Sequence, residues 1–235
     1  MIKQIEKDLK QYSNPEKAKH SQRFFKTGKG QYGQGDIFLG ITNPEIKEVV
    51  RKYYKEIDDD TLLHFIQSKY HEYRMFGLQC LVFKFQRSKE ETEEKEIYEM
   101  YIANTKYINN WDLVDVTAHK IVGAYLENKE RDILYTLAKS KGLWEQRIAI
   151  ISTFWYIKDN DFKDALKIAE ILVHHEHDLI HKAVGWMLRE IGKRDQDTEE
   201  KFLKKYYKTM PRTMLRYAIE KFEESKRQKY LKGEI

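Results

Sequence analysis

The sequence predicts an all-α protein, an α-α superhelix of about 12–13 helices in antiparallel pairs. Three observations lead to this fold class. The 235 residues include only 3 prolines and 11 glycines, so few residues interrupt a helix. Apolar residues recur at helical spacing along nearly the whole chain. Charged residues make up 34% of the chain, a share that a layered array of helix pairs tolerates because it exposes more surface per residue.

The expected helices follow one another with short connections. They span residues 2–12, 15–26, 44–57, 60–69, 71–87, 90–107, 110–128, 131–140, 144–158, 161–175, 178–192, 198–208 and 211–231. The prolines that fit a first helical turn are Pro15, Pro44 and Pro211. The candidate N-caps are Asp60 or Thr61, Asn110 and Thr198. The glycines that suit helix ends are Gly142 and Gly192.

A weak internal repeat favours one repeat domain over residues 1–235. Four segments, 74–77, 147–150, 182–185 and 212–215, begin with a basic residue and continue apolar. Two-helix repeats with periods in the mid-thirties to forties build α-solenoids, whose second helices line one concave wall. The basic residues Arg74, Arg147, Lys182 and Arg212 would then form a positive track for a phosphate backbone. The alternative is that they are solvated helix ends.

Charge and cysteine content narrow the class of protein. The net charge of +5 is a mild basic bias that permits an anionic partner without requiring one. Cys80 is the single cysteine, which excludes an internal disulfide and a multi-cysteine zinc site. No apolar stretch reaches the ~20 residues that cross a bilayer, and the amino-terminal segment lacks the apolar core of a signal peptide. We therefore expect a cytoplasmic protein without a membrane partner, and a monomer.

A glycine-rich stretch, residues 26–36, interrupts the helical pattern. Gly28, Gly30 and Gly33 match G-x-G-x-x-G, but a dinucleotide site needs a preceding strand in a βαβ unit, and here a basic helix precedes the motif. We expect a mobile loop or short hairpin in which Lys26, Lys29 and Tyr32 can touch a ligand.

The hexapeptide of residues 110–115 places an indole and a carboxylate four residues apart. In a helix that spacing puts Trp111 and Asp115 on one face, where they suit a groove that receives a flat or cationic group. Asp112 lies in the first turn, where the helix dipole favours a carboxylate, so helix stabilisation is a strong explanation for an acid at this position. Asp115 lies a turn further on and is the better candidate for a functional carboxylate, although a structural role remains the alternative.

A second candidate face contains Lys182, Trp186 and Arg189. A face with base, aromatic ring and base suits a sugar–phosphate surface, and the alternative is a core tryptophan flanked by cations that reach solvent. Arg147 is a candidate phosphate ligand, or else one half of an exposed salt bridge.

Four histidines between residues 174 and 181 raise the question of a metal. No cysteine and no Glu-x-x-His pair completes a ligand set, so we expect a surface helix end and no metal. There is also no P-loop and no deaminase signature, and we expect no cofactor.

Four segments together resemble one known family over nearly the full length of the chain. They are Phe38-Leu39-Gly40-Ile41 before Pro44, Trp111-Asp112-Leu113-Val114-Asp115, Trp144-Glu145-Gln146-Arg147-Ile148-Ala149-Ile150, and Gly185-Trp186-Met187-Leu188-Arg189-Glu190. They resemble the DNA alkylation repair, AlkD-type, HEAT-like repeat proteins. The resemblance implies a curved solenoid that binds double-stranded DNA on a basic concave face.

The resemblance also implies an activity and site residues. It implies a DNA glycosylase that excises cationic N3- and N7-alkylated purines without a metal and without flipping the base into a pocket. Trp111, Asp115 and Trp186 would surround the damaged nucleotide, and Arg147 would hold a phosphate. The glycine-rich segment departs from the family pattern, which has a shorter helical stretch with a tyrosine there. Since the family includes paralogues that resemble binders of branched DNA without excision, a DNA-binding module is the second hypothesis, and a protein-interaction solenoid is the third.

Overall fold

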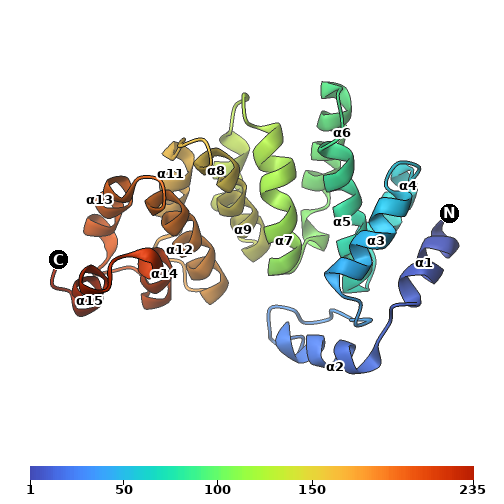
Figure 1. Cartoon of the computed structure of the whole chain (residues 1–235), viewed down its shortest axis with the longest axis horizontal. Coiled ribbons are helices and arrows are strands. Elements are labelled where there is room, and N and C mark those ends of the chain that lie inside the picture. The colour runs from blue at the N-terminus through green and yellow to red at the C-terminus, as the bar shows by residue number, and fades with distance from the viewer. The chain divides into compact units, whose positions relative to one another are not determined.

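The computed structural model describes all 235 residues and is helical throughout (Figure 1). The only strand-like feature is an isolated parallel bridge between Ile37 and Tyr70. Contacts divide the chain into two compact units, Met1–Ile121 and Val122–Ile235. In a repeat array each element contacts only its neighbours, so a division of the contacts into two units does not decide between one repeat domain and two domains. The single repeat domain expected over residues 1–235 therefore stays a prediction.

Helices α1 to α7 belong to unit 1. They are α1 (Ile2–Lys10), α2 (Pro15–Phe24), α3 (Asn43–Tyr53), α4 (Asp59–Ile66), α5 (His71–Phe85), α6 (Glu91–Ala103), the 3₁₀ turn η1 (Thr105–Tyr107) and α7 (Trp111–Ala118). The π-helical segment η2 (His119–Gly123) follows α7 directly.

Helices α8 to α15 belong to unit 2. They are α8 (Asp132–Ala138), α9 (Leu143–Ser152), α10 (Phe154–Ile157), α11 (Lys163–Leu172), α12 (Asp178–Gly192), α13 (Gln196–Tyr206), α14 (Arg212–Ala218), the 3₁₀ turn η3 (Ile219–Lys221) and α15 (Glu224–Lys232).

One central helix organises each unit. In unit 1, α5 is buried along almost its whole length and packs against α3, α4, α6 and α7. In unit 2, α12 packs against α9, α11, α13 and α14. Gly185 allows the close approach of α14, because a Cβ at this position would lie 2.5 Å from the carbonyl oxygen of Met214. Helix α5 is buried on nearly all sides and forms the core of its unit, whereas α12 is amphipathic and buries one face while Lys182, Trp186 and Arg189 stay partly exposed.

The predicted all-α class is confirmed, and most helix ranges differ only at their ends. Two expected helices are each divided, which gives fifteen α-helices instead of about 12–13. The range 144–158 contains α9 and α10. The range 211–231 is divided because Phe222 and Glu223 have extended backbone, and the Glu223 carboxylate caps α15 by accepting the N–H groups of Ser225 and Lys226.

The predicted N-caps are partly wrong. Asn110 caps α7 as expected. Helix α4 is capped by Asp58, whose carboxylate accepts the Thr61 N–H at 2.7 Å, and α13 is capped by Asp195, which accepts the Thr198 N–H at 2.9 Å. Thr61 and Thr198 thus supply the N–H of the capped turn, three residues after the acceptor that the cap requires. Pro211 precedes α14 by one residue, whereas Pro15 and Pro44 lie in first turns as expected.

The glycine-rich segment forms a series of turns, so the hairpin alternative is wrong. The Gln31 side chain accepts the Gly28 N–H at 2.9 Å, and the Gln34 side chain accepts the Gly30 N–H at 2.6 Å. Gly33 lies so close to the end of α2 that a Cβ would come within 2.4 Å of the Phe25 carbonyl oxygen. These turns lead the chain directly to a buried Asp36.

No helix in either unit combines the length and the apolar character that a membrane span would need.

Replacing Gly40 with alanine tests how α2 is attached to unit 1. Gly40 has φ +79°, and a Cβ there would lie 2.1 Å from the Asn14 carbonyl oxygen, at the start of α2. Gly30 has a similar φ of +76° but open space around it. We expect Gly30→Ala to lower the free energy of unfolding by about 1–2 kcal/mol through backbone strain, and Gly40→Ala by a further ~1–3 kcal/mol through the clash. Urea unfolding of both variants measures the difference, and equal losses would contradict the close packing.

Candidate functional site

The start of α7 divides its residues between a buried and a half-exposed face. Asn110, which is fully buried, has extended backbone and accepts the Trp111 N–H at 2.9 Å, so the helix begins at Trp111. Leu113 and Val114 are fully buried against the core of unit 1. Trp111 and Asp115, four residues apart, are both only half-buried. The predicted face therefore reaches solvent, and it carries an indole and a carboxylate.

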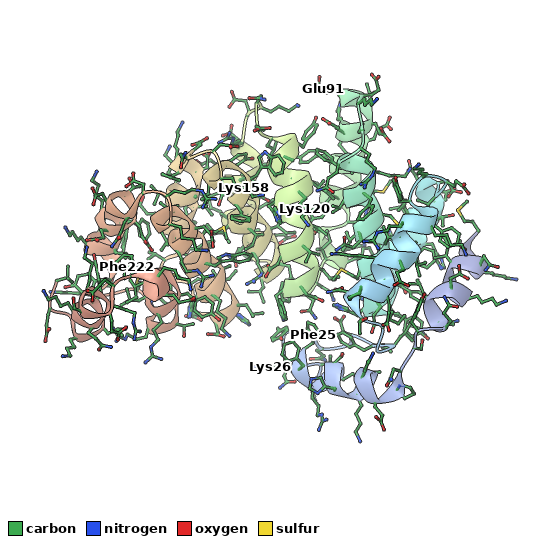
Figure 2. All side chains as sticks on the ribbon, viewed as in Figure 1. Phe25, Lys26, Glu91, Lys120, Lys158 and Phe222 are labelled. Atoms are coloured by element: carbon green, nitrogen blue, oxygen red, sulfur yellow. The ribbon has the colours of Figure 1, made fainter.

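Aromatic rings at the end of α2 support the Trp111 indole. The Phe25 ring is stacked on it at 5.3 Å between centroids with an interplanar angle of 25°, and the Phe24 ring meets it edge-on at 6.1 Å. Phe24 is 57% exposed. Figure 2 labels Phe25 and Lys26 at this end of α2. The indole is thus held by ring stacking, although it remains half-exposed.

Below Trp111 lies a buried network of charged side chains centred on His71. Its Nε2 lies 2.9 Å from Asp112 Oδ2, and its Nδ1 lies 3.3 Å from Asp36 Oδ2. Arg74 Nη2 donates to Asp36 Oδ1 at 2.6 Å, and Asn110 Nδ2 donates to Asp36 Oδ2 at 3.1 Å. Two carboxylates therefore face one imidazole and one guanidinium in the interior, where unpaired charges would be strongly destabilising.

The carboxylates decide the charge state of His71. Burial alone would lower the pKa of its imidazole, but the negative charge of Asp112 and the hydrogen bonds that Asp112 and Asp36 accept from the ring outweigh burial and raise the pKa to about 9. For Asp36, burial would raise the pKa, but the hydrogen bond with His71 and the charge of Arg74 hold it below its ordinary range. The network is therefore ionic at neutral pH, with the positive and negative charges balanced.

Asp115 lies beside a buried tyrosine of α6. The Tyr101 ring is fully buried, and its hydroxyl lies 2.9 Å from Thr117 Oγ1. Burial raises the pKa of Tyr101, and the nearby charge of Asp115 raises it further. Tyr101 and Thr117 thus form a neutral polar contact under α7, while the half-exposed Asp115 supplies a carboxylate next to the indole face.

In unit 2, a carboxylate holds the Trp186 indole. Trp186 lies on α12, half-buried, with the Phe154 ring 5.8 Å away. Its Nε1 donates to Glu190 Oε1 at 3.2 Å, and the same carboxylate oxygen accepts Lys193 Nζ at 2.6 Å. Arg194 lies 3.6 Å from the other oxygen of Glu190. Glu190 thus orients the indole and balances two neighbouring cations.

The predicted base–aromatic–base face carries less net charge than the sequence suggests. Lys182 forms an ion pair with Asp178 at 2.7 Å, and Arg189 pairs with Glu220. The acid at i−4 neutralises Lys182 on its own helix, whereas Glu220 reaches Arg189 from η3.

Two of the four repeated basic residues are buried. Arg74 is 3% exposed and also donates to the Ser68 carbonyl at 3.0 Å. Arg147 is 4% exposed and donates to the Leu179 carbonyl, which joins α9 to α12. At these two positions the expected exposed base is absent. Arg212 is exposed and donates to the Leu231 carbonyl at 2.8 Å, Lys29 is exposed and Tyr32 is half-buried. The DNA contacts assigned to all of these residues stay predictions.

Three histidines around the start of α12 form hydrogen bonds with nearby backbone groups. His175 Nδ1 accepts the His177 N–H at 2.9 Å, and His177 Nδ1 accepts the Leu179 N–H at 3.1 Å, which caps α12. The His181 imidazole is hydrogen-bonded to the His175 carbonyl. Neither unit contains a group of three histidine, cysteine or acidic side chains arranged to hold a metal ion.

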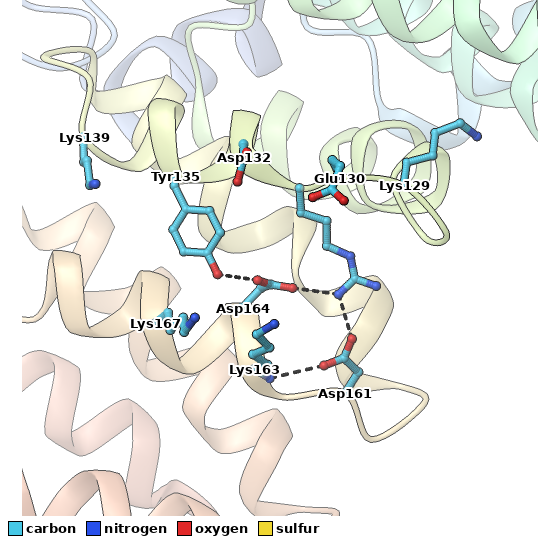
Figure 3. Close-up of a pocket in the computed structure, with 10 residues that line it drawn as sticks. Lys129, Glu130, Asp132, Tyr135, Lys139, Asp161, Lys163, Asp164 and Lys167 are labelled. Atoms are coloured by element: carbon cyan, nitrogen blue, oxygen red, sulfur yellow. Dashed lines mark hydrogen bonds and ion pairs between the residues drawn. The ribbon is translucent and has the colours of Figure 1, made fainter.

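A cavity of about 630 Å³ lies in unit 2 between α8 and α11 (Figure 3). Arg131 Nη1 lies 2.7 Å from both Asp161 and Asp164, and its guanidinium lies 3.5 Å from the centroid of the Tyr156 ring. The Tyr135 hydroxyl donates to Asp164. These groups satisfy one another and bind the two helices together, which is a structural role that the sequence did not indicate.

Sequence reasoning also missed the residues that orient the two indoles. Phe25 stacks on Trp111 and Glu190 accepts the Trp186 Nε1–H, and neither was a candidate. The buried pair of His71 and Asp36, which lies against Phe25, was not predicted either. The available signals were a histidine at the start of a helix whose middle is largely apolar and a glutamate four residues after Trp186.

The His71 network makes the stability of the protein depend on pH. The folded pKa of about 9 lies above the ordinary value of 6.5, so the stabilisation by His71 is fully present below pH 6.5 and is lost as pH rises through about 9. We expect the free energy of unfolding to fall by about 2–3 kcal/mol from this group between pH 6.5 and 9.5, as measured by urea unfolding.

His71→Gln should remove that part of the fall. Glu199 in unit 2 provides the control, because burial raises its pKa to about 9 and it therefore also destabilises the fold as pH rises from 4.5 to 9. Glu199→Gln should remove its own contribution and leave that of His71. A pH profile that His71→Gln does not change would contradict the ionic network.

Comparisons with known proteins agree with this architecture. The family model described as DNA alkylation repair enzyme matches residues 5–222. A solved structure described as a predicted DNA alkylation repair enzyme from Enterococcus faecalis superimposes with a TM-score of 0.68 at 20% identity, covering 89% of this chain and 96% of that chain. At this identity the likeness shows the fold, which is the all-helical superhelical repeat fold. No curated protein matches the sequence. Because the family model spans nearly the whole chain, the protein belongs to the DNA alkylation repair enzyme family.

Proposed function

We propose that this DNA repair protein is a monofunctional DNA glycosylase that hydrolyses the N-glycosidic bond of cationic N3- and N7-alkylated purines in duplex DNA. Membership of the DNA alkylation repair family supports the repair role and DNA as the partner. The observation that carries the enzymatic proposal is the half-exposed face of α7, where Asp115 accompanies the Trp111 indole.

In the proposed reaction the protein contributes mainly electrostatic stabilisation. An N-alkylated purine already carries positive charge, so the glycosidic electron pair leaves with the base and neutralises it. The barrier that remains is a sugar with oxocarbenium character. The Asp115 carboxylate would stabilise that charge and accept a proton from the water whose oxygen bonds to C1′. No acid is needed to protonate the leaving group, which is why a single carboxylate suffices.

The two tryptophans would supply aromatic faces to the cationic nucleotide. Each cation–π contact contributes about 0.5–2 kcal/mol. Both indoles are half-exposed, and both are oriented, Trp111 by the stacked Phe25 ring and Trp186 by the hydrogen bond to Glu190. Holding these rings in place before DNA binds avoids an entropic cost at the moment of reaction, which supports a catalytic rather than a general surface role.

The direct test is the release of 7-methylguanine and 3-methyladenine from methylated duplex DNA. Asp115→Asn keeps the size of the side chain and removes its charge, so we expect the single-turnover excision rate to fall by about 10²–10³-fold. Asp60→Asn, the same change at an exposed position on α4, is the matched control and should excise at the wild-type rate.

DNA binding is measured alongside excision to separate the two properties. If the wild-type protein releases neither base above background while it still binds DNA, the enzymatic proposal fails. An Asp115→Asn variant as active as wild type would leave the activity in place but remove Asp115 from it.

The second candidate function is recognition of branched or distorted DNA without excision. The observation that favours it is the glycine-rich segment, whose compact turns present an exposed Lys29 beside a half-buried Tyr32.

Under this second proposal a four-way junction should bind more tightly than a linear duplex of equal length in a gel-shift assay. Removing one phosphate contact with Lys29→Ala should weaken junction binding by about 3- to 10-fold and lower its salt dependence. Lys47→Ala, at an exposed position on α3, is the control. Equal affinity for junction and duplex would contradict this candidate function.

A further inference from the structure

The buried Asp36–His71–Asp112 bridge joins three segments that are far apart in the sequence. Asp36 ends the glycine-rich turns, His71 is the first residue of α5, and Asp112 lies in the first turn of α7. The side chains are 3%, 4% and 12% exposed, respectively. A bridge of this kind transmits the position of one segment to another, because each group can satisfy its charge only against its partners.

We propose that His71 is a positioning residue, which by bridging Asp36 and Asp112 fixes the first turn of α7 and with it the orientation of the Trp111 indole. The catalytic consequence of this inference rests on the proposed glycosylase function, whereas its structural part does not.

Two independent paths lead from His71 to Trp111. The first runs through the backbone: Asp112 receives His71 Nε2 on one oxygen and the Leu113 N–H at 2.9 Å on the other, and it directly follows Trp111. The second runs through rings: the Phe25 ring lies 5.3 Å from the His71 ring and 5.3 Å from the Trp111 indole. Phe38 stacks on His71 at 4.5 Å and on Phe25 at 5.0 Å, so the three rings form one cluster. Both the helix turn and the indole plane thus depend on the same imidazole.

The groups around His71 explain why an imidazole occupies this position. Asp112 and Asp36 accept from its two nitrogens, and Arg74 occupies the remaining oxygen of Asp36. Glu72 is the other carboxylate nearby, but it accepts the N–H groups of Leu39, Gly40 and Ile41 instead. An imidazole is the side chain that can donate from both ends of a flat ring while the ring packs against the Phe25 and Phe38 rings. Its pKa of about 9 keeps both nitrogens protonated at neutral pH.

The indole itself reports on this inference. The chain contains four tryptophans, so labelling with 5-fluorotryptophan gives four ¹⁹F signals that Trp→Phe variants assign. In His71→Gln, which is neutral and cannot bridge both carboxylates, we expect the Trp111 signal to shift or broaden. The Trp186 signal, from unit 2, is the internal control and should stay in place.

A pH titration separates positioning from a general structural effect. The wild-type Trp111 signal should titrate with a midpoint near pH 9, and His71→Gln should abolish that midpoint. Asp112→Asn retains an oxygen acceptor but removes one charge, so the midpoint should move down by about 1–3 pH units. If His71→Gln shifts all four signals together because the protein loses its fold, the shift of the midpoint in Asp112→Asn still tests whether His71 positions Trp111.

Excision adds a catalytic readout. With methylated DNA, His71→Gln should lower the single-turnover excision rate by about 10- to 100-fold, because small displacements of groups around the reacting atoms have effects of this size. Binding of undamaged duplex should change by less than about 3-fold, since no phosphate contact is removed.

The outcomes for His71 and for the proposed function are distinguishable. A wild-type Trp111 signal without a midpoint near pH 9, or one that neither variant alters, would overturn the positioning role even if the enzyme excises normally. Absence of excision by wild type would overturn the glycosylase proposal alone, because the ¹⁹F titration would still report on His71.

Discussion

Pairing of buried charge is the constraint on which the architecture around α7 depends. Removing a carboxylate or a cation from water costs several kcal/mol in a protein interior, by the general magnitude for buried ions, and only close partners offset that cost. Asp36, His71, Arg74 and Asp112 meet the requirement together, since every charge has an opposite charge within 3.3 Å. The glycine-rich turns, the start of α5 and the start of α7 must therefore keep their relative positions, or a charge is left without a partner.

This constraint gives two carboxylates of one helix different roles. Asp112, in the first turn of α7, is directed into the interior and is bound by His71. Asp115, three residues later, lies on the half-exposed side beside Trp111 and above the buried Tyr101–Thr117 contact. The first carboxylate holds the helix in position, and the second lies on the half-exposed face that the proposed reaction would use. A carboxylate that is needed for chemistry benefits from a neighbour that has already fixed the backbone.

Unit 2 orients its indole in another way. Trp186 uses its own Nε1–H, which donates to Glu190 one turn later on α12, and Lys193 shares that carboxylate. The basic residues of the two units also divide by burial. In the interior, Arg74 joins α5 to the connecting segments at Asp36 and Ser68, and Arg147 joins α9 to α12, whereas Lys29 reaches the surface. Charge on an α-helical repeat protein thus serves packing as well as partner recognition, and burial distinguishes the two uses.

The sequence by itself determined the helical class, most helix ranges, the Asn110 cap and the common face of Trp111 and Asp115, because these properties depend on spacing within one helix. The tertiary structure decided what depends on contacts between distant segments. It divided residues 211–231 at Phe222 and Glu223, and it buried Arg74 and Arg147, which local pattern could not distinguish from exposed bases. It also brought Asp36, His71 and Asp112 together across 35 and 41 residues of sequence. A pairing of this kind has no periodicity to reveal it, since it is the packing of α5 against α7 and the path of the glycine-rich turns that place the three side chains within hydrogen-bonding distance.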